Sequence, residues 1–373
     1  MSLKNDVKSV FITLLAIFAF ATVRANGAST SHSHEEEFNV GEMIMHHIKD
    51  AHEWHLWGPE HGGTAIYLPV ILIDGGVKTF SSAEFYHGTI QTTIDTKTNE
   101  EVNYVTGKNL ASGYAMYHEK IYKLNDNGAL TIADGHVHGN VKPLDFSVTK
   151  NVLSLFFGAI LILFLMFSVA KFYKKHGSVS PKGIAKFLEP IIVMVRDDVA
   201  KSNIDHHHYK KYVPYLLTIF FFIWINNMLG LVPIIPGGAN LTGNLSVTLF
   251  LAICTLLVTL FSANKNYWKH IFATPGVPIL LLPIMIPIEF VGIFTKPFAL
   301  MIRLFANITA GHIIVLALIS IIFINKNLAW GALSVPMALF ISVLELLVAF
   351  LQAYLFAMLS ALFIGAAVEE AHH

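Results

Sequence analysis

Residues 296–307 read Lys-Pro-Phe-Ala-Leu-Met-Ile-Arg-Leu-Phe-Ala-Asn and lie within an apolar run, 277–324, whose only charged side chains are Glu289, Lys296 and Arg303. A second apolar run, 327–368, follows a short polar stretch and contains one charged side chain, Glu345. Both runs are about twice as long as the ~20 residues that cross a bilayer upright. They therefore predict a long helical hairpin that tilts, bends or lies partly along the membrane plane.

Three further apolar segments precede this hairpin. Residues 152–170 contain no charged side chain and are long enough for one crossing. Residues 212–264 contain no Asp, Glu, Lys or Arg, and prolines and glycines at 233–238 interrupt them, which predicts two helices joined by a loop. The amphipathic residues 184–200 predict a helix lying on the membrane surface. The fold class is thus an all-α polytopic membrane protein of about five membrane helical segments, with a small β-containing domain at its N-terminus.

The composition agrees with a membrane protein. Hydrophobic residues make up 54% of the 373 residues and charged residues only 13%, and the mean hydropathy is +0.58. Soluble domains carry roughly 25% charged residues, so a disordered chain, a coiled coil and a nucleic-acid binder are all disfavoured. The single cysteine, Cys254, excludes an internal disulfide framework. It lies in an apolar run, where we expect a small buried side chain.

The formal net charge of zero is the sum of two opposite halves. Residues 26–151 hold 8 Lys and Arg against 16 Asp and Glu, whereas residues 152–368 hold 14 against 6. The strongly basic loops, 171–211 and 265–270, fall on one side of the predicted helices, and the opposite loops, 233–245 and 324–330, contain only Lys326. The positive-inside rule places the basic side, and with it the C-terminus, in the cytoplasm. The acidic half is then extracytoplasmic.

The N-terminus has the pattern of a secretory signal peptide, 1–25. Lys4 and Lys8 precede an apolar run, 10–21, that is too short to span a bilayer, and cleavage is expected after Ala25. We interpret residues 26–145 as an acidic, His-rich extracytoplasmic domain. Within it, short apolar runs and turn signals at 74–76 and 125–128 predict a small β-containing fold over about 62–140.

Histidines gather at the start of that domain. His52 and His55 would share one face if this segment were helical, which leaves a metal site open. The segment does not match a zinc-protease helix, which needs two residues between its glutamate and its second histidine. The alternative is therefore a solvated, pH-sensitive polar segment. No metal site is assigned.

Arg303 is the most unusual side chain of the hairpin. An arginine at the centre of a membrane helix costs roughly 2.5–3.5 kcal/mol on insertion scales. It cannot avoid this cost by losing its proton, since its pKa lies above about 12. We interpret Arg303 as the electrostatic partner of a mobile or external carboxylate.

Counting residues from a turn near 327 predicts which side chains of the hairpin face each other. Arg303 should lie opposite Gln352, and His312 should pair with Glu345 nearer the outer surface. Glu289 lies 14 residues before Arg303, close to the same helix face and about 21 Å toward the cytoplasm at 1.5 Å per residue. His and Glu can carry protons near neutral pH, whereas Arg cannot. The pattern predicts an outer and an inner polar path, separated by a fixed cation that prevents a leak.

These residues carry a resemblance to a known family. Residues 296–312, residues 345–356 and the stretch Asn-Met-Leu-Gly-Leu-Val-Pro at 227–233 are similar to subunit a of the rotary F-type ATP synthases, over about 150–373. The acidic domain before 145 is a departure from most members.

The resemblance implies a function and a set of partners. The chain would be the stator subunit that provides two proton half-channels beside the rotating c-ring, with no catalytic activity of its own and no cofactor. Its partners would be the c-ring, the subunit b peripheral stalk, the F1 ATPase head and the lipid bilayer of a bacterial inner membrane, with no nucleic acid.

The resemblance also implies residue roles. Arg303 would be the essential arginine that faces the c-ring, and Glu289 the carboxylate of the cytoplasmic side. The half-channel and interface positions would be Asn307, His312, Glu345 and Gln352. Asn226 and Asn227 look like lining of the outer channel, although amides that only pack helices together are the alternative.

Two other functions were weighed. A stand-alone proton-coupled secondary transporter with a periplasmic domain should show inverted repeats, and the sequence has none that we detect. An exported metal-binding protein anchored in the membrane would leave Arg303 and Glu345 unexplained. The choice between H⁺ and Na⁺ stays open, because the ligands that select the ion belong mostly to the c-ring.

Overall fold

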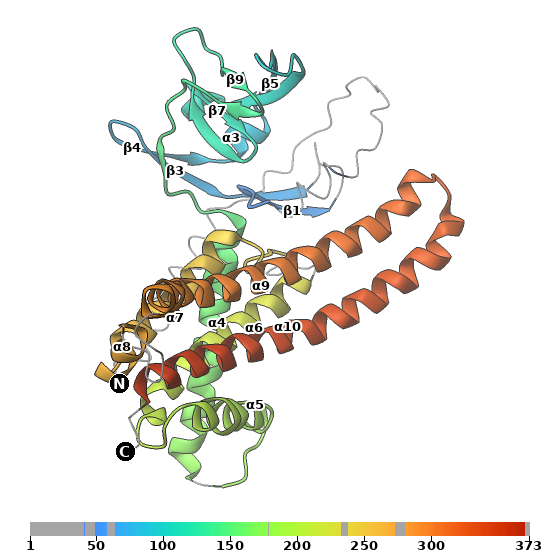
Figure 1. Ribbon diagram of the computed structural model, residues 1–373. Helices are drawn as coiled ribbons and strands as arrows, with labels where there is room; N and C mark the ends of the chain where they lie inside the picture. The colour runs from blue at the N-terminus through green and yellow to red at the C-terminus, as the bar shows by residue number, and fades with distance from the viewer. Residues whose placement is uncertain are drawn as a thin grey trace. The chain divides into compact units, whose positions relative to one another are not determined.

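The computed structural model describes residues 41, 49–57, 64–177, 179–232, 238–272 and 281–369 (Figure 1). The chain divides into two compact units, which meet in sequence between Leu153 and Ser154. The predicted signal peptide and most of the His-rich stretch lie outside the described residues.

The N-terminal unit is built from short antiparallel strands. Its sheets have the strand orders β1-β2, β11-β3-β4, β5-β6-β7-β8 and β10-β9. The elements are β1 (Glu53–Trp57), β2 (Thr64–Tyr67), β3 (Pro69–Ile73), β4 (Val77–Ser81), α3 (Ala83–Tyr86), β5 (Thr89–Ile94), β6 (Glu101–Thr106), η1 (Asn109–Ala111), β7 (Tyr114–Tyr117), β8 (Lys120–Lys123), β9 (Ile132–Ala133), β10 (His136–Val137) and β11 (Leu144–Asp145).

The predicted β-containing domain is therefore confirmed, and its strands reach further than 62–140. The turn at 74–76 joins β3 to β4, and the turn at 125–128 has Gly128 at φ 71°, a backbone conformation that glycine adopts without strain. Successive side chains of a strand point to opposite faces of the sheet. Val70, Leu72 and Phe80 point to the inner face and are buried in the core.

The helical arrangement that would place His52 and His55 on one face is not present. Residues 53–57 form β1 and pair with β2, with Trp54 opposite Ile66. The shared helix face on which the metal-site alternative depended is therefore absent.

The first and last segments of the unit are joined by a buried polar cluster. His52, 3% exposed, lies 3.5 Å from the Glu119 carboxylate and 3.7 Å from that of Asp145. The Asp50 carboxylate accepts hydrogen bonds from the Thr149 hydroxyl and from the Asn151 N–H in the first turn of α4, where a negative charge is favoured. These contacts attach both ends of the domain to the start of that helix.

The second unit is helical. Its elements are α4 (Lys150–His176, which begins in the first unit), α5 (Ile184–Met194), the π-helical η2 (Val195–Lys201), α6 (Tyr209–Leu231), α7 (Leu245–Ser262), α8 (Lys265–Phe272), α9 (Leu282–Ile324), η4 (Leu328–Trp330) and α10 (Gly331–Val368). Five helical segments among the described residues are long and apolar enough to cross a membrane, which confirms the predicted fold class. The chain is a multi-pass membrane protein.

The last two helices form the expected hairpin. In Figure 1, α9 and α10 run side by side and are joined at their far end by η4. With 43 residues, α9 is about 65 Å long at 1.5 Å per residue, twice the ~30 Å of the hydrocarbon core. Its length therefore requires a strong inclination to the membrane normal, as the sequence predicted.

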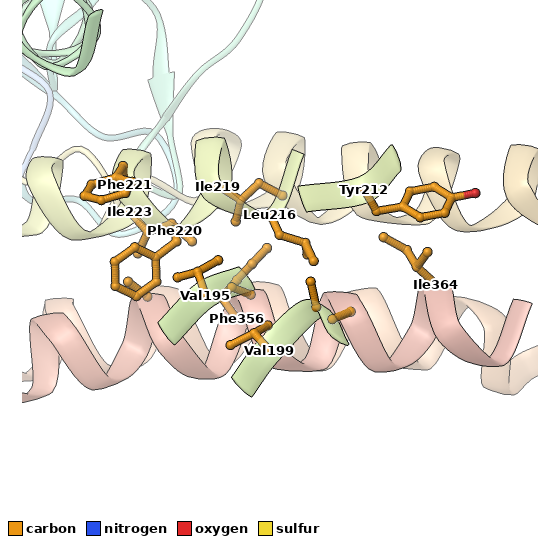
Figure 2. Close-up of a cluster of buried hydrophobic side chains, with 14 of the residues drawn as sticks. Val195, Val199, Tyr212, Leu216, Ile219, Phe220, Phe221, Ile223, Phe356 and Ile364 are labelled. Carbon is orange, nitrogen blue, oxygen red and sulfur yellow. The ribbon is translucent and has the colours of Figure 1, made fainter. Parts of the chain in front are cut away.

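The amphipathic segment 184–200 forms α5 and most of η2. Its apolar side chains Val195 and Val199 are fully buried among residues of α6 and α10, such as Leu216 and Phe356 (Figure 2). On α5, Ile184 and Phe187 remain exposed. The segment therefore packs on protein through η2, and its position on the membrane surface stays a prediction.

Two smaller expectations also need correction. The basic loop 265–270 forms the short helix α8, with Lys265 and Lys269 exposed. Cys254 is half-buried rather than buried, because α7 exposes part of its apolar surface, Ile253 and Leu257 included.

Candidate functional site

The register of the α9–α10 hairpin positions the candidate residues. The Asn307 amide donates a hydrogen bond of 3.0 Å to the side-chain oxygen of Gln352, which is buried. The Ser334 hydroxyl donates to the carbonyl of Leu318 nearer the turn. The two helices are thus antiparallel neighbours about a turn near 327, as predicted.

The pairing of Gln352 is one helical turn away from the prediction. Counting from the turn placed Gln352 opposite Arg303, but its hydrogen-bond partner is Asn307. Every Cα–Cβ bond tilts toward the N-terminus of its helix. In an antiparallel pair, Gln352 therefore leans toward the turn and Asn307 leans away from it. These opposite tilts bring the two side chains together, whereas those of Arg303 and Gln352 diverge.

His312 and Glu345 lie together in the half of the hairpin nearer its turn. Both line one small cavity whose other walls come from α6 and from the segment before α7. Glu345 lies directly against Gly311, and a Cβ added at Gly311 would overlap its carboxylate. The absence of a side chain at 311 is therefore what allows Glu345 to approach α9 at this level.

Asn226 and Asn227 form another wall of the same cavity. They are 1% and 3% exposed on α6, and Asn227 accepts a hydrogen bond of 2.5 Å from the Thr242 hydroxyl. Gly158 of α4 lies so close to Asn226 that a Cβ there would overlap the amide. Both asparagines are thus brought to His312 and Glu345 by the fold.

Asn240 and Thr242 also line this cavity, although the sequence alone did not single them out. Both lie in the segment 233–245, which was interpreted only as a loop, and the amides and hydroxyls between two apolar helices were the available signal. Asn240 accepts a hydrogen bond from the Gly243 N–H at 2.8 Å.

The cavity has the size of a single water molecule, and polar side chains form part of its wall. Among the described residues, the Asn226 Oδ1, Asn227 Nδ2 and Asn240 Nδ2 atoms are buried without a hydrogen-bond partner. The open space measures about 10 Å³, near the lower limit for one water, which needs two to four polar partners. The arrangement is suited to binding water beside a histidine and a carboxylate.

Arg303 lies on a different surface of the hairpin. Its neighbours Leu300 and Leu304 are buried, whereas Arg303 itself is exposed in this chain next to the exposed Ile302. Among the described residues, no carboxylate lies within ion-pair distance of its guanidinium.

Glu289 lies on the same continuous helix, well before Arg303. The short helix α8 packs against α9. Burial and the charge of Glu289 both raise the pKa of Tyr267 on α8, and Tyr267 is a further polar group that the sequence did not single out. The candidate residues therefore occur in four places: Glu289, the exposed surface at Arg303, the Asn307–Gln352 pair, and the cavity of His312 and Glu345.

A metal centre finds no support in this geometry. Within the described ranges, no group of three or more His, Cys, Asp or Glu side chains is arranged to hold a metal ion.

Residues 152–365 match the family described as ATP synthase A chain. The chain belongs to this family. The matched span contains Arg303, Glu289, the Asn307–Gln352 pair and the cavity residues described above. Residues 43–146 match a separate family, described as a domain of unknown function (DUF8433).

Individual relatives of the chain carry the name of the same family. The chain is 48% identical over 235 residues to ATP synthase subunit a of Chloroherpeton thalassium, which covers 61% of this chain and 69% of the relative. It is 44% identical over 277 residues to ATP synthase subunit a of Chlorobium phaeobacteroides strain DSM 266, covering 72% and 78%. The corresponding protein of Myxococcus xanthus is 46% identical over 236 residues, covering 62% and 76%.

Proposed function

We propose that this chain is the stator subunit of a membrane-bound ATP synthase that conducts protons past the c-ring. Family membership supports the role, and the observation that carries it is an exposed arginine, Arg303, on the same helix as one wall of a small cavity lined by His312 and Glu345. The subunit catalyses no reaction by itself and couples proton movement to rotation.

The outer half-channel ends at the cavity. Water held by Asn226, Asn227 and Asn240 would bring a proton to His312 and Glu345, whose side chains can both bind and release one. From there the proton passes to a carboxylate on the c-ring, which becomes neutral and can turn into the lipid. The buried amides without partners support this path, because they can hydrogen-bond water.

Arg303 separates the two half-channels. When a protonated c-ring carboxylate returns after nearly a full turn, the guanidinium favours its ionised form, and the proton leaves toward Glu289 on the inner side. A guanidinium keeps its own proton at any physiological pH, so no proton can pass directly from the outer path to the inner one. Its exposure on the hairpin surface supports contact with another chain. The Asn307–Gln352 pair stabilises the hairpin one turn away.

The assembly and orientation follow from the same role. The partners are the c-ring, the subunit b peripheral stalk and, through the complex, the F1 ATPase head. The distribution of Lys and Arg supports a bacterial inner membrane topology with a cytoplasmic C-terminus and an extracytoplasmic mature N-terminus after a cleaved signal peptide, 1–25. The extracytoplasmic domain then comprises 26–145, and the membrane domain 150–373.

The function is tested by Arg303→Ala in the assembled complex reconstituted into vesicles. ATP-driven proton pumping should be abolished while ATP hydrolysis by the detached head is unchanged. Lys296→Ala is the matched control, since it removes one positive charge from the same helix, where Lys296 lies over the Phe363 ring instead. Normal pumping by Arg303→Ala, or an equal loss in Lys296→Ala, would contradict the proposal.

A further inference from the structure

The sheet β11-β3-β4 of the N-terminal unit has an apolar face that nothing in the described chain covers. The register pairs Leu144 with Ile73, and Ile73 with Val77, in one row across the three strands. These side chains are 65%, 39% and 69% exposed. The opposite face of the same sheet holds Val70 and Leu72, both fully buried in the core.

The chain after β11 extends this face. The Phe146 N–H donates to the Ile71 carbonyl at 2.9 Å, and the Val148 N–H donates to the Pro69 carbonyl at 3.0 Å. Alternation along an extended segment therefore points Leu144, Phe146 and Val148 the same way. Phe146 is 63% exposed. The outer apolar face consists of Ile71, Ile73, Val77, Leu144, Phe146 and Val148.

The outer apolar face carries no charged side chain among the described residues. Thr79 takes the position opposite Ile71. The charged residues of these strands lie on the other side: Lys78 is 4.9 Å from the ring of the buried Tyr114, and Asp145 pairs with the buried His52. In a domain with twice as many acidic as basic residues, a contiguous uncharged patch marks an interaction surface.

The outer apolar face lies just before the candidate membrane helix α4 in the chain, and this position indicates the membrane as its partner. Val148 precedes by two residues the start of α4 at Lys150, and α4 is a candidate membrane span whose exposed apolar side chains begin with Val152 and Phe156. Phe146 lies at most about 13 Å of extended chain from that helix, at 3.3 Å per residue. The outer apolar face thus continues along the chain into a lipid-facing surface.

The charge of the N-terminal domain also favours the membrane as the partner. Anionic headgroups attract basic segments and repel acidic ones, and residues 26–151 hold 16 acidic against 8 basic side chains. An uncharged apolar face is the surface that can approach the bilayer without that repulsion. We propose that the outer apolar face rests on the outer leaflet of the membrane, with Leu144, Phe146 and Val77 inserted among the lipid headgroups and the upper acyl chains.

The test places an environment-sensitive fluorophore on single cysteines in a Cys254→Ser background. Phe146→Cys and Val77→Cys report on the outer apolar face. Ile90→Cys is the matched control, because Ile90 is 57% exposed on β5, in a different sheet. The complete ATP synthase is reconstituted into vesicles of phosphatidylethanolamine and phosphatidylglycerol that contain a doxyl-labelled lipid as quencher. Normal proton pumping by each labelled complex shows that the variants fold.

We expect the doxyl lipid to quench the fluorophore at 146 and 77 severalfold more strongly than at 90, while aqueous iodide quenches mainly position 90. Iodide quenching at all three positions would overturn the proposal, because the face would then be in water. Protection of 146 and 77 from both quenchers would also overturn it, because another protein would then cover the face. The readout does not depend on proton transport, so its failure is separate from a failure of the proposed function.

Discussion

Gly311 shows how a single residue without a side chain determines the position of a candidate residue. An added Cβ there would overlap the carboxylate of Glu345, which would have to shift. We predict that Gly311→Ala lowers ATP-driven proton pumping by roughly tenfold or more, since misplacing a reacting group by about 1 Å can cost about 100-fold in rate. Fluorescence quenching by acidified vesicles measures the rate.

Gly292 is the control for this prediction. It lies on the same helix, and a Cβ there would meet nothing within 4 Å. Gly292→Ala should therefore pump at the rate of the unaltered chain. Equal rates for the two variants would show that the contact between Gly311 and Glu345 does not matter for transport.

His52 gives the N-terminal domain a pH-dependent stability. Burial alone lowers the pKa of His52, but the carboxylates of Asp145 and Glu119 outweigh it and raise the pKa to about 9, above the ordinary 6.5. The protonated imidazole therefore stabilises the folded domain fully below about pH 6.5, and this contribution is lost as the pH rises through 9. A shift of this size corresponds to on the order of 3 kcal/mol.

We predict that proteolysis of the domain in the intact complex accelerates between pH 7 and pH 9.5. The comparison with His52→Gln isolates the imidazole from the tyrosines and lysines that also titrate in this range. The variant should be cleaved faster at pH 7, and its rate should change less with pH. Parallel pH profiles for the two chains would rule out His52 as the source.

At the scale of elements, the bundle depends on the close approach of α10 to the end of η2. A Cβ added at Gly365 would overlap the backbone carbonyl of Asn203, and a backbone atom in a packed helix cannot move aside as a side chain can. Gly365→Ala should destabilise the helical unit by about 1–3 kcal/mol, the usual cost of overpacking.

The thermal stability of the solubilised complex measures this effect. Gly331→Ala is the control, because its Cβ would only reach Ile322 Cδ1 at an ordinary 3.7 Å, and alanine is the better helix former. We expect a lower unfolding temperature for Gly365→Ala and an unchanged or higher one for Gly331→Ala. A Gly365→Ala complex as stable as the control would contradict the packing argument.

At the scale of the whole molecule, the charge distribution predicts the orientation in the membrane. In a Cys254→Ser background, Lys326→Cys should react with an impermeant maleimide added to intact spheroplasts, and Lys269→Cys should react only after the cells are opened. The reason is that Lys326 belongs to the loop opposite the basic side, whereas Lys269 belongs to the basic side. The reverse pattern of labelling would invert the topology.

The membrane architecture could be predicted from the sequence because it depends on local properties. Length and hydropathy identify each crossing without knowledge of its neighbours, so the five spans and the long hairpin were foreseen. Residues 184–200 show the limit of local properties. Their amphipathic pattern indicated an apolar environment, but only the fold showed that Val195 and Val199 pack against α6 and α10.

The sequence by itself determined the membrane helices, the hairpin turn near 327 and the unusual charges Glu289, Arg303 and Glu345, because a charge in an apolar run is conspicuous wherever the chain folds. Only the tertiary structure decided that Gln352 meets Asn307 and that Asn240 and Thr242 join the cavity of His312. These contacts depend on side-chain tilt and on approach between segments far apart in the chain. These distances are set only when the helices pack, so they cannot be read from the order of residues.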